Sequence, residues 1–328
     1  MSRKLGWGIL ATGWIAELFT QDLLDADLRV AAVGSRSRDK AEDFAARFKI
    51  PSAYGSYRDL VSDPDVDVVY IATPHPQHAE CATLALEAGK HVLVEKAFTL
   101  NAAEARRVVD LARERNLVIL EAMWTRFLPH MIRIRQIIAS GGLGEIISIS
   151  ADHRQALPSD PTHRLNDLRL GGGALLDLGI YPVSFAIDLL GPPVSLTALA
   201  RFKDTGADAE VVATMRHANG AMSTSTCASD YAGPNIATIF GSRARLEIPA
   251  IWFTPSPFRV IDHHGNIVED YTDTVSGRGM QFQAFEMEAL VRSGDTSTLM
   301  PPEQSVEIMK TLDAIRRQIG LVYPQEQT

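Results

Sequence analysis

The sequence predicts an α/β protein of two domains: a doubly wound parallel sheet, followed by an α+β domain with an open antiparallel sheet. Apolar strand-like runs alternate with amphipathic helical patterns over residues 1–122. Strand-like runs joined by short turns dominate residues 145–271. The chain has 328 residues, more than the roughly 100 to 200 residues of a typical single domain. We therefore expect one domain at 1–122 and a second at 123–328.

Five apolar runs in the first domain have the length and composition of buried strands. They lie at 5–10, 29–34, 67–74, 91–96 and 117–123. Amphipathic stretches separate them, and this alternation is typical of parallel strands joined by crossover helices. Asn101, with Glu104 three residues on, predicts the start of the helix after the fourth run.

The second domain shows the pattern of an antiparallel sheet. Five strand-like segments lie at 145–154, 194–202, 209–229, 237–248 and 258–271. Asn219-Gly220 and Gly265-Asn266 are glycine-containing dipeptides typical of tight hairpins. Strands joined by such short turns pair antiparallel.

Three helical segments accompany these strands. The first, 171–193, opens on glycines and stops at Gly191 and two prolines, and the others are 281–293 and 304–320. The two C-terminal helices either stay with the second domain or pack back on the first.

Composition and charge exclude several classes of protein. The chain is 46% hydrophobic and 22% charged, and its 40 acidic residues outnumber 32 basic ones. Nucleic acid is therefore not an expected partner. No segment reaches the roughly 18 apolar residues that span a bilayer, so no membrane partner is expected either and a cytoplasmic protein is the plain interpretation. Cys81 and Cys227 stand alone, which indicates neither a disulfide framework nor a zinc site.

The turn after the first strand-like run resembles a dinucleotide fingerprint of the Rossmann type. In the stretch "GILATGWIAE", Ala11, Gly13 and Ala16 occupy its three small-residue positions, with alanine in place of the first glycine. Gly13 would let the backbone approach a pyrophosphate at the helix N-terminus. The residues expected to contact the cofactor here are Ala11, Thr12, Gly13, Trp14 and Ile15. A turn that only needs small residues for packing is the alternative.

The end of the second run favours NADP(H) over NAD(H). An NAD-binding fold places an acidic residue there to bind the ribose 2′-hydroxyl. Here the chain reads "AVGSRSRDK", with Ser35, Arg36 and Arg38 and no acid before Asp39. Hydroxyl and guanidinium donors suit a 2′-phosphate. NAD(H) stays open as the second cofactor, and a solvated basic helix start is the alternative for these residues.

The carboxyl ends of the next strands carry the candidate chemistry. Ligands of doubly wound sheets bind beyond these ends, where "ATPHPQH" supplies Thr73, His75 and His78 and "HVLVEK" supplies Glu95 and Lys96. Neighbouring strand residues point to opposite faces, so Glu95 and Lys96 cannot both point outward. We expect Lys96 to face the cofactor and Glu95 to face cofactor or backbone, with a simple surface lysine as the alternative.

The segment "DLGIY" offers a partner for Lys96. Asp177 and Tyr181 are four residues apart and would share a helix face, although Pro182 biases Tyr181 away from helical angles. A nearby ammonium lowers the pKa of a phenol, so Tyr181 with Lys96 could exchange a proton with an alcohol while Asp177 orients Lys96 or the substrate. The alternative is a tyrosine that only packs in the core.

Four motifs together resemble the glucose-fructose oxidoreductase / inositol dehydrogenase / MocA family. They are "HVLVEKAF", "EAMWTRFLP", "GGGALLDLGIYP" and "TLDAIRRQIGLVYP", in family order along the chain. The match is to the branch of dimeric dihydrodiol dehydrogenases and NADP-dependent D-xylose dehydrogenases. The resemblance implies a Rossmann domain and an α+β domain that dimerises through its open sheet.

The resemblance also implies roles for individual residues. Lys96 would be the lysine of the family's Glu-Lys-Pro motif, Tyr181 the general acid/base and Asp177 its companion. Further cofactor or substrate contacts are implied for Trp124, Phe127, Arg164 and Trp252, although His163 stands where relatives of this kind have a tryptophan before Arg164. Ala97 replaces the motif proline, so the peptide geometry after Lys96 could differ.

The predicted function is an NADP(H)-dependent oxidoreductase acting on a CH–OH carbon of a sugar or cyclic trans-diol. No metal is expected, because Lys96 and Tyr181 handle the alkoxide. The remaining histidines, such as His153, show no metal-ligand spacing. A cofactor-sensing regulator without turnover and an NAD-dependent glycosidase are the alternatives for this fold.

Overall fold

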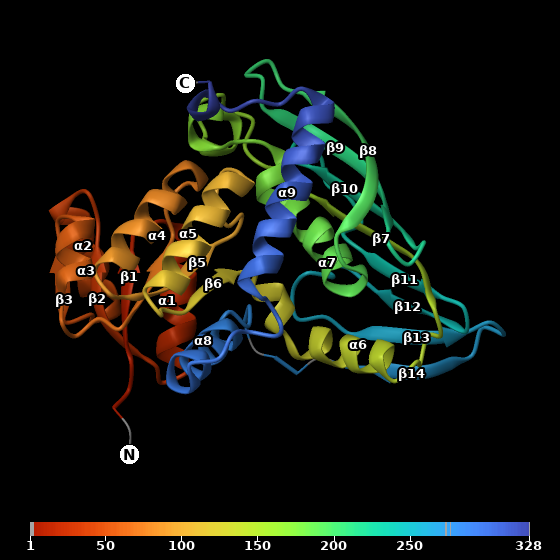
Figure 1. The fold of residues 1–328 in the computed structure, drawn as a ribbon, viewed down its shortest axis with the longest axis horizontal. Coiled ribbons are helices and arrows are strands. Elements are labelled where there is room, and N and C mark those ends of the chain that lie inside the picture. The colour runs from red at the N-terminus through yellow and green to blue at the C-terminus, as the bar shows by residue number, and fades with distance from the viewer. Residues whose placement is uncertain (1–2, 273, 276, 328) are drawn as a thin grey trace. The chain divides into compact units, whose positions relative to one another are not determined.

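Two units make up the protein in the computed structural model, which describes residues 3–327 except 273 and 276. Unit 1 comprises Met1–Trp124 and Gly279–Val306, and unit 2 comprises Thr125–Arg278 and Glu307–Thr328. Figure 1 shows the elements of each unit in chain order.

Unit 1 is built on a six-stranded parallel sheet. Its strand order is β3-β2-β1-β4-β5-β6. The strands are β1 (Gly6–Leu10), β2 (Arg29–Gly34), β3 (Ser52–Tyr54), β4 (Val68–Ile71), β5 (His91–Glu95) and β6 (Ile119–Ala122). Every residue of β1 and β4 is buried, as expected for strands covered on both faces. The order reverses between β1 and β4, which is where such sheets bind their ligands.

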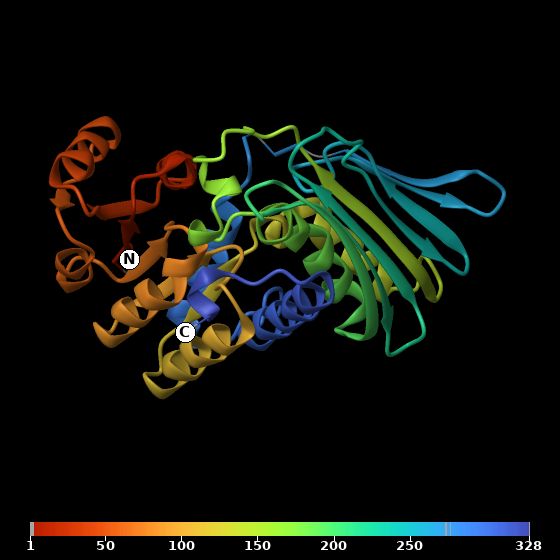
Figure 2. The same cartoon turned by 90° about the horizontal axis from the view of Figure 1, so that it is seen from above.

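Helices cover both faces of this sheet. They are α1 (Trp14–Asp25), α2 (Arg38–Phe48), α3 (Tyr57–Ser62), α4 (His78–Glu87) and α5 (Ala102–Glu114). Figure 2 shows α1 and α2 on one side of the strands and α4 and α5 on the other. The predicted cap of α5 is confirmed, because Asn101 Oδ1 accepts the Glu104 N–H at 3.0 Å. The sequence analysis missed β3, since a strand of three half-buried residues shows no periodicity.

The C-terminal part of unit 1 contains α8 (Gln281–Ser293), which packs on α1. The Met280 N–H donates to Asp22 Oδ2 at 2.8 Å, and the Trp7 indole donates to Glu288 Oε1 at 3.2 Å. The last helix, α9 (Pro302–Ile319), contains the unit boundary between residues 306 and 307.

Unit 2 contains an eight-stranded sheet of order β14-β13-β12-β11-β7-β10-β9-β8. The strands are β7 (Ile146–Arg154), β8 (Pro193–Phe202), β9 (Asp208–His217), β10 (Met222–Ala228), β11 (Ala237–Gly241), β12 (Ala244–Ile248), β13 (Phe258–Asp262) and β14 (Ile267–Tyr271). All neighbours pair antiparallel except β7 and β10, which are parallel. The predicted fold class is confirmed, with this parallel pair as an addition: the chain leaves β7, forms a helix and returns through β8 and β9 to β10.

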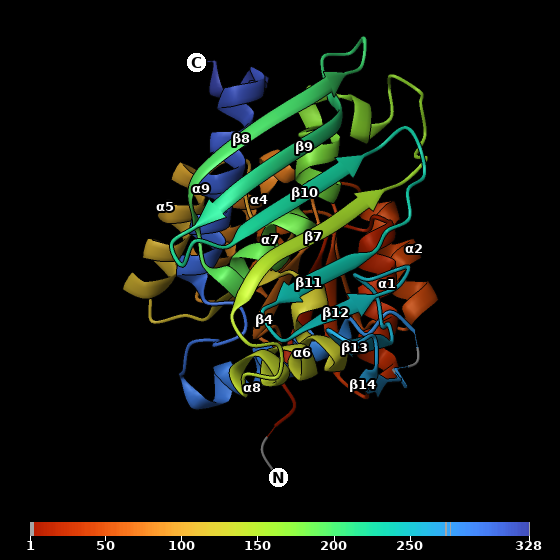
Figure 3. The same cartoon turned by 90° about the vertical axis from the view of Figure 1, so that its right-hand side faces the viewer.

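One face of the unit 2 sheet packs on a helix. Residues of β9 alternate between buried and exposed, so one face belongs to the core. The core face packs against α7 (Ile180–Leu190). Figure 3 shows the other face, in front of which no helix of the described chain lies. Unit 2 also contains α6 (Pro129–Ala139).

One helical stretch, Leu168–Leu190, is long and apolar enough to cross a membrane. The expectation that no segment reaches this length was therefore wrong. However, 78% of its most apolar window is buried inside the protein, as in a core helix, and one such helix is weak evidence for a membrane span.

Candidate active site

The turn between β1 and α1 leaves room for a group outside the protein. Ala11 has a φ of +83°, and its N–H donates to the Gly34 oxygen at 2.9 Å. Gly13 precedes α1 with a φ of −77°, and a Cβ added to it would have no neighbour within 4 Å. Neither the backbone nor the packing therefore requires glycine at this position. A pyrophosphate fits here, because close backbone approach at a helix N-terminus favours an anion.

The other residues of this turn are partly or largely exposed. Thr12 and Ile15 are half-buried, and Trp14 is 63% exposed. Ala16, in the first turn of α1, is fully buried, as its small side chain predicts.

Two arginines near the end of β2, Arg36 and Arg38, differ in whether a carboxylate of the described chain pairs with them. Ser35 is buried, and its Oγ accepts the Ser37 N–H at 3.3 Å. Arg38 pairs with Glu42 at 2.7 Å. Arg36 is exposed and forms no ion pair with any residue that the structure describes. Among the basic residues predicted to bind the cofactor here, Arg36 is the one whose charge is left for a ligand.

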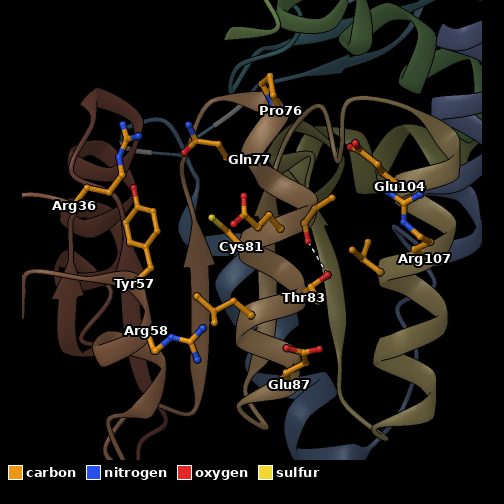
Figure 4. A pocket seen from close by; sticks show the side chains of 14 residues that line it. Arg36, Tyr57, Arg58, Pro76, Gln77, Cys81, Thr83, Glu87, Glu104 and Arg107 are labelled. Atoms are coloured by element: carbon orange, nitrogen blue, oxygen red, sulfur yellow. Dashed lines mark hydrogen bonds between the residues drawn. The ribbon is translucent and has the colours of Figure 1, made fainter. Parts of the chain in front are cut away.

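Arg36 lies at the rim of a surface cavity of about 760 Å³ in unit 1. Figure 4 shows Arg36, Tyr57 and Gln77 at one end of this cavity and Glu104 and Arg107 at the other. Burial raises the pKa of Tyr57, and the charge of Arg36 opposes this shift. Tyr57 and Gln77 could not be predicted as site residues from the sequence, because each becomes a neighbour of Arg36 only in the folded sheet.

At the end of β5, the charged pair Glu95 and Lys96 follows the apolar run. Glu95 is 4% exposed, accepts the Tyr70 hydroxyl at 2.5 Å and accepts the Lys96 N–H at 3.2 Å. Glu95 thus faces the sheet interior and the backbone. Lys96 is half-buried, and the peptide bond between Lys96 and Ala97 is cis.

His78 contacts the backbone next to Lys96. Its ring nitrogens lie 2.8 Å from the Thr73 oxygen and 2.9 Å from the Ala97 oxygen. Burial lowers the pKa of His78 to about 4. The prediction that His78 contacts the cofactor is therefore corrected, because both nitrogens face backbone oxygens. His75 also contacts this backbone, with its Nε2 3.3 Å from the Lys96 oxygen.

In unit 2, the structure brings Asp177 and Arg164 together. Asp177 lies in a π-helical turn, Leu175–Gly179, that runs directly into α7. Its Oδ1 accepts a hydrogen bond from Arg164 Nη2 at 3.4 Å. Tyr181 is the second residue of α7. The expected single α-helix is thus a wide turn joined to an α-helix, the irregularity that often marks functional segments.

Tyr181 stands in an aromatic cluster that the sequence analysis missed. Its ring meets His153 edge-on with centroids 4.9 Å apart, and Phe253 lies 5.3 Å away. His153 stacks on Phe253 at 3.8 Å and lies 2.7 Å from Gln155 Nε2 through its own Nε2. The inward position of His153 on β7 could have indicated burial, but its neighbours come from distant segments.

The aromatic residues predicted to line the substrate are buried. Trp124 is 1% exposed, Phe127 4% and Trp252 0%. The Trp252 indole donates to the Asp152 oxygen at 2.7 Å, and its ring packs on Phe185 with centroids 4.9 Å apart. This burial supports core packing for these three residues.

A doubly wound sheet with an open helix N-terminus after β1 and a basic end on β2 is typical of dinucleotide-binding proteins. Comparison with known protein families places the chain among oxidoreductases. Residues 5–122 match the model of an oxidoreductase family with an NAD-binding Rossmann fold, and residues 131–247 match the GFO/IDH/MocA C-terminal domain. The chain belongs to the glucose-fructose oxidoreductase / inositol dehydrogenase / MocA family, which confirms the resemblance.

Relatives align over almost the whole chain. Trans-1,2-dihydrobenzene-1,2-diol dehydrogenase of Mus musculus is 35% identical over 333 residues, covering 98% of this chain and 99% of the relative. D-xylose 1-dehydrogenase (NADP(+)) of Hypocrea jecorina is 36% identical over 366 residues, covering 98% and 93%. Among solved structures, KijD10, a 3-ketoreductase from Actinomadura kijaniata in complex with NADP and TDP-benzene, has a TM-score of 0.86 at 27% identity, covering 97% and 98%.

Proposed function

We propose that this chain is an NADP(H)-dependent oxidoreductase that transfers a hydride between the nicotinamide and a CH–OH carbon of a sugar or cyclic trans-diol. The observation that carries the choice of cofactor is Arg36, an arginine without an ion-pair partner at the end of a strand where no acid stands. The substrate class follows the diol dehydrogenase and D-xylose dehydrogenase relatives.

Proton transfer is assigned to Tyr181, Lys96 and Asp177. The nicotinamide, when bound, supplies or accepts the hydride. Tyr181 gives a proton to the substrate oxygen during reduction and takes it during oxidation. The Lys96 ammonium favours the phenolate and so lowers the pKa of Tyr181, while Asp177 orients Lys96 or the substrate hydroxyls.

Residues of unit 1 would bind the pyrophosphate and the 2′-phosphate of the cofactor. The turn Ala11–Ile15 would bind the pyrophosphate, and Ser35, Arg36 and Arg38 the 2′-phosphate. Arg164, which pairs with Asp177, would contact cofactor or substrate. In this scheme residues 1–122 bind the dinucleotide, and residues 123–328 bind the substrate and form the dimer.

An absorbance assay at the nicotinamide band tests the function. Aldoses, inositols and trans-diols are offered with NADP+ or NAD+, and turnover is expected with NADP+. Lys96→Met and Tyr181→Phe should each lower kcat by at least about a hundredfold, the usual size of a general acid/base contribution. NADPH binding, measured by fluorescence, should persist in both variants.

Two outcomes of this assay would contradict the proposal. Near-normal turnover in both variants would exclude the mechanism. NADPH binding by the wild-type protein without turnover on any substrate would instead support a cofactor-sensing regulator.

The proposal also includes a homodimeric assembly and a cytoplasmic location. The uncovered face of the unit 2 sheet carries exposed apolar side chains, among them Leu199 at 76% and Met222 at 42%. Such a face supports a homodimer formed through this sheet.

Cys81 and Cys227 are both free and buried, as in proteins of a reducing compartment, which supports a cytoplasmic location.

A further inference from the structure

A buried carboxylate stands at the start of the segment that carries Asp177 and Tyr181. Asp208, the first residue of β9, is 0% exposed. Its Oδ2 accepts the Leu175 N–H at 2.6 Å, a short bond to the first residue of the π-helical turn. The first N–H groups of a helical segment have no partner within the segment, so this carboxylate satisfies one of them from a neighbouring strand.

The glycine run before this segment is shaped by the same carboxylate. Gly173 has a φ of +132°, and a Cβ on it would lie 1.9 Å from Asp208 Oδ1. A side chain at this position would be strained and would also occupy the space of the carboxylate. The close approach of Asp208 to the helix start therefore depends on glycine at 173.

Asp208 occupies an unfavourable place for a charge. Burial raises its pKa to about 6, while hydrogen bonds from backbone amides, that of Leu175 first, oppose the shift. The titratable groups that interact with it are Lys203, Cys227 and Tyr323. Lys203 donates to Asn166 Oδ1 at 2.5 Å, and none of the described residues forms a salt bridge with Asp208. Burying a carboxylate lowers the stability of the fold, so we expect Asp208 to have a role other than stability.

What depends on this bond is the geometry of the wide turn. Asp177 follows Leu175 by two residues and lies in the same turn, and Tyr181 follows directly after it in α7. A π-helical turn is less regular than an α-helical one, so its course is set by contacts at its ends. At its start, the contact is the bond to Asp208.

We infer that Asp208 is a positioning residue, whose carboxylate holds the turn Leu175–Gly179 in the geometry in which Asp177 and Tyr181 act on the substrate. This inference rests on the proposed function of those two residues. Asp208 would then set the rate of turnover and not the binding of the cofactor, because its side chain is fully buried and bonds to the turn.

The test compares Asp208→Asn with a matched control, Asp204→Asn. Both substitutions remove one negative charge with little change of shape, but Asp204 is exposed in the loop before β9. Asp208→Asn is expected to lower kcat at least tenfold and to leave the KM for NADP+ and the fluorescence titration with NADPH within twofold of wild type. Hydrogen exchange at the Leu175 amide should accelerate at least tenfold. Asp204→Asn should change none of these quantities.

Three outcomes would overturn the inference. They are an unchanged kcat in Asp208→Asn, an unchanged exchange rate at Leu175, and a loss of NADPH binding and thermal stability together with kcat, which would show a purely structural role. Tyr181→Phe, measured in parallel, separates the two proposals. If Tyr181→Phe is inactive and Asp208→Asn is fully active, only the inference fails; if Tyr181→Phe is active, the proposed function fails.

Discussion

At the scale of single residues, the proposed selection of the cofactor depends on the charge at the end of β2. Arg38, in the same segment, is partly neutralised by Glu42 at 2.7 Å. Arg36 keeps its charge for a ligand. A guanidinium binds a 2′-phosphate through charge-assisted hydrogen bonds, whereas a carboxylate there binds the 2′-hydroxyl of NAD.

Arg36→Asp is therefore expected to reverse the cofactor preference. The KM for NADP+ should rise at least tenfold, because the new carboxylate repels the 2′-phosphate, while the KM for NAD+ stays equal or falls. Steady-state kinetics with both cofactors measures the ratio. Arg107→Asp, the same charge change at the far end of the same cavity, serves as control and should leave the ratio unchanged. An equal loss with both cofactors would show that Arg36 supports the fold and does not select the cofactor.

Secondary-structure elements of unit 2 are joined by a buried ionic network. The Arg126 side chain is 3% exposed and donates to the Ser184 hydroxyl at 2.9 Å and to the Ser184 oxygen at 2.7 Å, within α7. Asp188 lies 3.6 Å from Arg126 and 2.7 Å from Arg135 of α6. One carboxylate of α7 thus serves two guanidinium groups and holds α6 against α7.

Asp188→Asn should lower the free energy of unfolding by about 3 kcal/mol, because it removes the carboxylate of a buried ion pair and leaves its cations in place. Asp110→Asn is the control, since Asp110 pairs with Arg106 and Arg113 but is 43% exposed. A surface pair of this kind contributes about 1 kcal/mol or less. Urea denaturation of the three proteins measures the difference. Equal values for the two variants would mean that solvent screens the network around Asp188.

At the scale of the whole molecule, the uncovered sheet face of unit 2 is the surface on which the proposed dimer depends. Its strands place Leu199 opposite Val212 and Phe240 opposite Ser148, so apolar side chains lie among hydroxyl-bearing ones. Leu199, at 76% exposure, is the most exposed large apolar side chain in the described chain. Exposed apolar patches of this kind mark interaction surfaces.

Leu199→Asp should convert the proposed homodimer into a monomer, because pairing the two faces would bury the new charge without a partner. Light scattering after size-exclusion chromatography measures the mass at micromolar protein. Val322→Asp adds the same charge at an apolar side chain that is 48% exposed but lies outside the sheet, and this variant should remain dimeric. A monomeric wild-type protein would contradict the proposed assembly.

The sequence alone was enough for the fold class and for the family. Alternation of apolar runs and amphipathic stretches predicted the parallel sheet, because periodicity is a property of neighbouring residues. The same pattern placed Gly13, Arg36 and Lys96 at strand ends, where such sheets bind ligands. The expectation that Glu95 faces cofactor or backbone came from strand geometry, and Glu95 accepts the Tyr70 hydroxyl and the Lys96 N–H.

Only the tertiary structure decided what individual side chains contact. His78 follows a strand end as a ligand-binding residue would, yet its nitrogens face the Thr73 and Ala97 oxygens. The family resemblance implied a substrate contact for Trp252, which is a core residue. Asp208 carried no motif, and its bond to Leu175 joins a strand to a helix start. The physical reason is that burial and hydrogen bonding are set by segments distant along the chain, and no local pattern records which of them will meet.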